Sequence, residues 1–279
     1  MNTFLSGLIN GLADNHAHLN MLDQPLEVIE SFYKNNGRYV LDVAVNKRAL
    51  NKSLQFLSKL SEDFKRIVKL SFGIHPEYFK PIEFLRAEES NFAYADPEQA
   101  VQDTIQIFKE YKQIKVLGEI GLDIYKLQDN QSNILAKQEA YLGQIVEFAK
   151  QNNVPVMLHL RGVDNSDFSL FKRALSILEQ AGIKSCDDLP VYFHSFTADL
   201  DVAKFLTDRG FFIGINGIIT YSNVEHIREA VKYTPSQFIL VETDSPFLKP
   251  SNLGQSRFKQ NTPLSVQKIQ EYIDKLKSS

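Results

Sequence analysis

Two histidines near the start of the chain are spaced so that they can share a metal ion. Residues 13–20 read ADNHAHLN, which places His16 and His18, two of the chain's six histidines, one residue apart. In an extended strand, side chains at positions i and i+2 point to the same side, so both imidazoles can converge on one ion. On a helix the two side chains would point about 200° apart. The pair alone is weak evidence, because two hydrogen-bonded surface histidines give the same pattern.

Four more residues that could bind a metal ion lie near the ends of later apolar segments. They are Glu119 in LGEIGLD, His159 in VMLHLRG, His194 in YFHSF and Asp244 in VETDSPF. Burying such a group without a partner costs several kcal/mol or shifts its pKa. Ordinary hydrogen bonding explains any one of them, but not all six at equivalent positions. Four imidazoles and two carboxylates can hold two divalent ions if one carboxylate bridges them, and such a pair can activate a water for hydrolysis.

The elements that must position these side chains alternate between strand and helix. Seven nearly continuous apolar runs are typical of parallel strands buried on both faces. They are residues 39–45, 67–75, 114–122, 154–160, 190–196, 210–217 and 238–244, and the HxH segment adds an eighth. Amphipathic stretches between them predict helices, clearly so at 96–111, 135–153 and 201–210. Asp96 is a plausible N-cap, Gln99 could complete a capping box, and Gly210 is a plausible C-cap.

This alternation predicts an α/β fold, a (β/α)8 TIM-type barrel that forms a single domain over residues 1–279. An open doubly wound sheet is the alternative. Barrel enzymes carry their catalytic groups at the C-terminal ends of the strands, which is where the six residues fall. No GxGxxG motif follows the first strand and no P-loop is present, which speaks against a nucleotide cofactor. Residues 76–95 predict a loop with some irregular helix over the barrel mouth.

Composition restricts the classes of partner. Lys and Arg total 31 against 34 Asp and Glu, whereas a protein that coats duplex DNA is usually basic, so any nucleic-acid contact should be confined to a small site. The one cysteine, Cys186, excludes an intrachain disulfide and fits a reducing compartment, so we expect a cytoplasmic location. No signal-peptide pattern is present, and the apolar stretch 210–224 is too short for a membrane span. We therefore expect no membrane association.

Six motifs together resemble one known family. ADNHAHL, FGIHPEY, VLGEIGLD, PVMLHLRG, FHSFT and VETDSPFLKP occur in the order found in the TatD family of metal-dependent hydrolases, within the amidohydrolase superfamily. The resemblance runs from about residue 11 to about residue 263. It implies a distorted (β/α)8 barrel and hydrolysis of ester bonds. Characterised members include deoxyribonucleases that remove nucleotides from DNA 3′ ends, and members with other hydrolytic activities.

The resemblance also implies roles for individual residues. Six positions match the family's metal ligands: His16, His18, Glu119, His159, His194 and Asp244. The first two histidines would bind one metal and the last two the other, while Glu119 bridges. Asp244 would bind the first metal and transfer protons, so Asp244 and Glu119 are the expected catalytic residues. The expected cofactors are two divalent ions, Mg²⁺, Mn²⁺ or Zn²⁺. Glu242, on the same strand face as Asp244, would orient a ligand or form a buried ion pair.

Two further positions are expected to bind substrate. His75, in GIHP, would contact the substrate or its phosphate, and the alternative is a loop histidine held by the geometry of Pro76. Arg161 follows the fifth-strand histidine by two residues, so it points to the same side and could bind a phosphate oxygen with two hydrogen bonds. The alternative for Arg161 is an ion pair with Asp164 or Asp167.

Departures from the family pattern leave the substrate open. The first motif contains Ala17 and Asn20, the segment after His159 reads VDNSDFSL, HSFTADL lacks the usual glycine, and Gln260 replaces an arginine. We expect a two-metal phosphodiesterase of the DNase type, with DNA or another phosphodiester or ester substrate at the barrel mouth. The alternatives are a hydrolase of another ester, amide or small phosphoester, for example an aminoacyl ester, and a non-catalytic metal-binding barrel.

Overall fold

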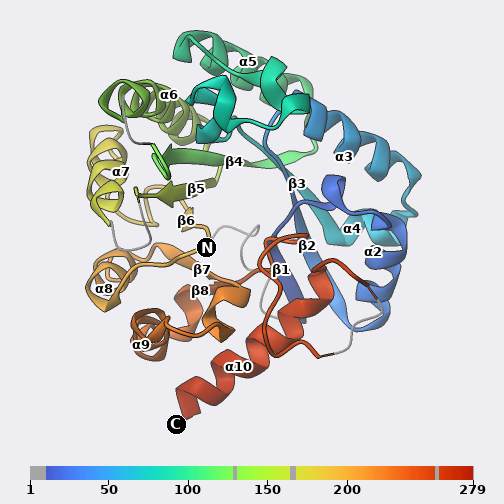
Figure 1. Ribbon diagram of the computed structural model, residues 1–279. Coiled ribbons are helices and arrows are strands. Elements are labelled where there is room, and N and C mark those ends of the chain that lie inside the picture. The colour runs from blue at the N-terminus through green and yellow to red at the C-terminus, as the bar shows by residue number, and fades with distance from the viewer. Residues whose placement is uncertain (1–10, 128–130, 164–167, 255–257, 279) are drawn as a thin grey trace.

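Eight parallel strands form one sheet in the order β1 to β8, and helices surround it on the outside (Figure 1). The computed structural model describes residues 11–127, 131–163, 168–254 and 258–278. The strands are β1 (Leu12–Ala17), β2 (Gly37–Ala44), β3 (Val68–Phe72), β4 (Ile114–Asp123), β5 (Val156–Arg161), β6 (Val191–Phe193), β7 (Phe212–Ile215) and β8 (Ile239–Val241). A parallel bridge between Ala17 and Ser245 joins the last strand to the first. The predicted (β/α)8 barrel is confirmed, and the alternative of an open sheet is wrong.

All eight predicted strands are present, but six of them, β1, β2, β3, β6, β7 and β8, end one to three residues earlier than predicted. β1 ends at Ala17, β6 at Phe193 and β8 at Val241, so His18, His194 and Asp244 lie in the segments that follow. Shortly after two of these strands the backbone turns, because Ser195 and Asp244 have φ angles of 49° and 52°. A left-handed residue cannot continue an extended strand.

Helices cover the outside of the barrel. They are α2 (Pro25–Lys34), α3 (Lys47–Lys59), α4 (Glu62–Ile67), α5 (Pro97–Glu110), α6 (Gln131–Asn152), α7 (Ser169–Gln180), α8 (Leu200–Thr207), α9 (Glu225–Tyr233) and α10 (Val266–Ser278). The apolar stripe predicted on α6 is fully buried. α10, red in Figure 1, packs beside α9 and against β1 and β8, where the barrel closes. Among the described residues, no helix combines the length and apolar character needed to cross a bilayer.

Of the predicted helix ends, the N-cap at Asp96 is confirmed. The Asp96 side chain accepts a hydrogen bond from the backbone of the first turn of α5, at 3.0 Å. The capping box is wrong, because the Gln99 amide instead donates to Asp103, at 3.0 Å, one turn further along the helix. α8 ends at Thr207 with Asp208 as its C-cap, so Gly210, with a φ of 73°, lies two residues beyond the cap, in the turn that follows the helix. Glycine is the residue that adopts this left-handed conformation most readily.

Residues 76–95 form short 3₁₀ turns rather than a regular helix, as predicted. The turns span Pro76–Phe79, Ile82–Phe84 and Ala87–Phe92. We call residues 76–95 the rim segment. Its side chains contribute to the cleft at the C-terminal ends of the strands. The rim segment is therefore the part of the chain that shapes one side of the barrel mouth.

We expect Gly121→Ala to lower the free energy of unfolding by at least about 2 kcal/mol, because β4 and β5 approach too closely for a side chain there. Gly121 has a φ of 147°, and a Cβ atom would overlap the backbone carbonyl of His159. Urea unfolding followed by circular dichroism measures the change. The matched control is Gly143→Ala on α6, where a Cβ meets its nearest neighbour at 3.9 Å. Gly143→Ala should raise the free energy of unfolding by about 0.5–1 kcal/mol, because alanine favours a helix over glycine. Equal stabilities of the two variants would contradict the packing argument.

Candidate metal centre

The first half of the centre forms where β1 meets the segment after β8. The Nε2 atoms of His16 and His18 are 3.2 Å apart, so both imidazoles point at one place. The Oδ1 atom of Asp244 lies 3.4 Å from each of these nitrogens. The Oε2 atom of Glu119, from β4 across the barrel, lies 3.5 Å from His16 Nε2. Two imidazoles and two carboxylates thus converge inside the mouth.

The second half of the centre uses the other oxygen of Glu119. Its Oε1 atom lies 2.6 Å from His159 Nδ1 and 3.6 Å from His194 Nε2. The rings of His16 and His194 stack with centroids 3.5 Å apart, which brings the two halves into contact. Glu119 therefore faces one group of histidines with each oxygen. All six residues named from the sequence lie in one cluster.

The outward-facing ring nitrogens of His18 and His159 lie beside oxygen acceptors, whereas that of His16 lies 3.2 Å from the sulfur of Met157. His18 Nδ1 lies 3.0 Å from the carbonyl oxygen of Val43, and His159 Nε2 lies 3.2 Å from Asp123 Oδ2. A proton on the outer nitrogen leaves the inner nitrogen with a lone pair directed at the centre. The donor atoms of His16, His18 and Glu119 lie within 4.8 Å of one another, as do those of Glu119, His159 and His194. This donor set fits divalent ions that accept imidazole and carboxylate ligands.

Glu242 orients His194 from beneath the centre. This fully buried carboxylate lies 3.0 Å from His194 Nδ1 and accepts hydrogen bonds from Ser195 N at 2.8 Å and Asn216 Nδ2 at 3.1 Å. The Tyr192 hydroxyl donates to it as well. With these contacts the Glu242 side chain has little freedom, so the His194 ring is fixed with Nε2 toward Glu119.

Asp123 and Lys80 were assigned no role from the sequence. Lys80, in the rim segment, is buried and donates from Nζ to Asp123 Oδ1 at 2.7 Å, while the other oxygen of Asp123 faces His159. The alternation of a strand indicated Asp123, because it lies four residues after Glu119 on the same face of GEIGLD. Lys80 left no such signal, because the path of an irregular segment is not periodic.

Charge within the cluster opposes the effect of burial. Burial alone would lower the pKa of His18, but the Asp244 and Glu119 carboxylates raise it to about 9. Burial would likewise lower the pKa of His159, but Asp123 and Glu119 raise it to about 10. Burial would raise the pKa of Glu119, but the surrounding imidazoles hold it well below its usual range. In the metal-free centre the Glu119 carboxylate is therefore ionised and His18 and His159 are protonated, whereas burial and the neighbouring His194 hold the pKa of His16 well below its usual range.

His75 and Arg161 both lie at the mouth. His75 Nε2 is 3.4 Å from Glu119 Oε1, while its Nδ1 accepts from the backbone N–H of Glu77 at 3.1 Å. Arg161 is exposed and its guanidinium carbon lies 3.6 Å above the ring of Tyr125. Its proposed partners in the alternative interpretation, residues 164 and 167, lie outside the described residues, as does much of the altered segment after His159. The His75 and Arg161 side chains both line the cleft that contains the cluster.

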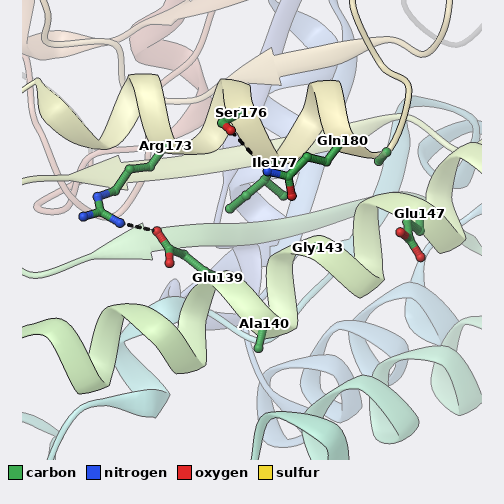
Figure 2. Close-up of a pocket in the computed structure, with 9 residues that line it drawn as sticks. Glu139, Ala140, Gly143, Glu147, Arg173, Ser176, Ile177 and Gln180 are labelled. Carbon is green, nitrogen blue, oxygen red and sulfur yellow. Dashed lines mark hydrogen bonds and ion pairs between the residues drawn. The ribbon is translucent and has the colours of Figure 1, made fainter.

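That cleft has a volume of about 490 Å³ and is lined by five of the six clustered residues, all except His16. A second cavity, of about 410 Å³, lies between α6 and α7 and is shown in Figure 2. An ion pair between Arg173 and Glu139, 2.8 Å long, spans its edge. None of its lining residues also lines the mouth cleft. Substrate chemistry at the cluster therefore takes place in the mouth cleft.

Relatives of this chain are metal-dependent hydrolases by name. A protein from Escherichia coli K12 named an uncharacterized metal-dependent hydrolase is 35% identical over 164 residues, which cover 59% of this chain and 56% of that protein. The match thus spans little more than half of that relative's length. A relative with the same kind of name from Buchnera aphidicola subsp. Baizongia pistaciae is 28% identical over 275 residues, covering 96% of this chain and 89% of its own.

Solved structures share the fold. A TatD homolog from Escherichia coli superposes with a TM-score of 0.72 at 18% identity, covering 95% of this chain and 90% of its own. A TatD family hydrolase from Entamoeba histolytica has the same TM-score at 15% identity, covering 96% and 92%. A family model described as TatD related DNase matches residues 13–279. Because that match covers nearly the whole chain, and the fold agrees with it, this chain belongs to the TatD family of metal-dependent hydrolases.

Proposed function

We propose that the protein is a two-metal phosphodiesterase that releases nucleotides from the 3′ ends of DNA. The observation that supports this most directly is the position of Glu119, which faces His16 with one oxygen and His159 and His194 with the other. The same six residues would hold two divalent ions, Mg²⁺, Mn²⁺ or Zn²⁺. When bound, such ions lower the pKa of an attacking water and neutralise charge on a phosphate.

Asp244 is the proposed proton-transfer residue. Its side chain is 15% exposed to the cleft, whereas the His16 side chain beside it is fully buried. Contacts from His16 and His18 to Oδ1 hold the carboxylate in place. A positioned carboxylate that reaches solvent can accept the proton of a water and pass it to the leaving group.

Arg161 and His75 are the proposed phosphate contacts. Arg161 keeps its charge at any physiological pH, and stacking on Tyr125 fixes the plane of its guanidinium group. His75 lies beside Glu119, so it would meet a phosphate held at the centre. These two groups would recognise one strand end rather than a long duplex, which agrees with the formal net charge of −3.

A second candidate is hydrolysis of a small ester or phosphoester, such as an aminoacyl ester. Apolar side chains line much of the cleft, among them Phe84, Leu85, Phe168 and Leu248. The position where the family has an arginine carries Gln260, whose amide oxygen accepts from the backbone of Asp23 at 3.1 Å. An apolar wall and a missing positive charge both favour a smaller and less charged substrate.

Release of nucleotides from 3′-ended single-stranded DNA with Mn²⁺ or Mg²⁺ tests the proposal. Asp244→Asn should lower kcat by about 10²–10⁴-fold, because proton transfer is lost. Exposed Asp187 offers a control, and Asp187→Asn should leave the rate unchanged. No release by the natural sequence, together with turnover of 4-nitrophenyl acetate, would overturn the nuclease assignment and favour the ester candidate.

Glu242→Gln should weaken metal binding by about 10–100-fold, because an amide cannot accept all the hydrogen bonds that hold Glu242 beneath His194. Competition with a chromophoric chelator measures the affinity. Glu229, which is exposed on α9, provides the matched variant Glu229→Gln, which should bind metal normally. Equal affinities of the two variants would show that His194 needs no orienting partner.

Metal binding should release protons at pH 7. His18 has a pKa of about 9 and His159 of about 10 in the metal-free protein, so both are protonated there. Because a metal ligand must be a neutral imidazole, affinity for Mn²⁺ should rise as the pH rises from about 7 toward about 9. Calorimetry in two buffers of different ionisation enthalpy counts the protons. Asp123→Asn removes a carboxylate that raises the pKa of His159. This variant should therefore release fewer protons when it binds metal. A binding enthalpy independent of buffer would refute this.

A further inference from the structure

Phe247 presents a fixed aromatic surface beside the candidate metal centre. Its backbone N–H donates to the carbonyl oxygen of Asp244 at 2.8 Å, and the Asn261 side chain donates to its carbonyl oxygen at 2.6 Å. The side chain is nevertheless 39% exposed and lines the mouth cleft. Its ring centroid lies 6.0 Å from that of His18, with the planes at 71°. A large apolar ring held open to solvent next to a candidate ligand is suited to contact whatever is bound there.

Arg86 of the rim segment also lines the cleft and lies over this ring. Its guanidinium carbon is 5.9 Å from the centroid of Phe247. Arg161 and Tyr125, also at the mouth, lie at only 3.6 Å and are in direct stacking contact. Arg161 is therefore stacked directly on Tyr125, a closed pair, whereas Arg86 and Phe247 are further apart and form an open pair.

The separation of the open pair is smaller than, but close to, the spacing that a planar guest needs. A ring inserted between a guanidinium plane and a phenyl plane needs two contact distances of about 3.5 Å, or about 7 Å in all. The observed 5.9 Å falls short by about one ångström, and Arg86 is exposed at the end of a flexible side chain. A small movement of this side chain would admit one flat ring.

From these contacts we infer that Arg86 and Phe247 form a nucleobase subsite next to the metal centre. The inference rests on the proposed function. It assigns this subsite to the base of the nucleotide whose phosphate would lie at the cluster. A base has a π-face for Phe247 and attracts the guanidinium group of Arg86, so it stacks with little regard to sequence. Apolar neighbours such as Leu85 and Leu248 would surround the edge of the base.

Fluorescence can detect such stacking directly, because the chain contains no tryptophan. Phe247→Trp introduces a single indole, which dAMP should quench saturably in the metal-loaded protein. Deoxyribose 5-phosphate, which lacks the base, should not quench it at the same concentration. Adding Arg86→Met should weaken the dAMP response by about tenfold. Equal quenching by the two probes would overturn the subsite.

Kinetics provide a second, independent test. Phe247→Leu should raise KM for 3′-ended DNA about tenfold, and should have no such effect on DNA whose terminal nucleotide is abasic. The control is Phe205→Leu on α8, because Phe205 is exposed and stacked with Arg209 at 3.6 Å but lies outside the cleft. An equal rise in KM for the intact and the abasic substrate would overturn the subsite.

The outcomes separate the subsite from the proposed nuclease activity. Base-dependent quenching without DNA hydrolysis would support the subsite and overturn only the nuclease assignment. DNA hydrolysis that is indifferent to the terminal base would support the nuclease and overturn only the subsite.

Discussion

The closure of the barrel between β8 and β1 is the contact on which the candidate centre depends. The Asp14 carboxylate is fully buried at this seam and accepts hydrogen bonds from Thr243 N at 2.9 Å, from the Thr243 hydroxyl at 2.5 Å and from His16 N at 3.2 Å. Asp244 N donates to the carbonyl oxygen of His16 at 2.8 Å. These bonds place Asp244 beside the two histidines of the first strand. If the seam opened, the carboxylate and the imidazoles would no longer face the same point.

Next to that seam, each imidazole and carboxylate of the cluster has a polar partner. Four imidazoles and two carboxylates sit within a mostly apolar core, where an unpaired charge would be costly. The outer contacts of His18, His159 and His194 to a carbonyl or a carboxylate meet this requirement and also set the direction of each ring. The hydrogen bonds that satisfy these buried histidines thus also direct their inner nitrogens toward the candidate metal centre.

The irregular part of the backbone lies at the mouth. The rim segment supplies Lys80 to the Asp123–His159 pair and Arg86 to the cleft, although its own backbone forms only short 3₁₀ turns. The strands and their ends carry the cluster, while the rim segment and the loops surround the space above it. This division agrees with the general arrangement of barrel enzymes, in which strand ends carry the reacting groups and the loops surround the substrate.

The sequence by itself determined the strand–helix alternation and the six polar residues at strand ends, because apolar runs and alternation along a strand are local patterns. It also indicated Asp96 as an N-cap and the irregular character of residues 76–95. Only the tertiary structure decided which oxygen of Glu119 faces which histidine, that Lys80 reaches Asp123, and that Arg86 stands over Phe247. These contacts join segments far apart in the chain. They depend on how the barrel closes and how irregular segments cross its mouth, and no periodic pattern in the sequence encodes either.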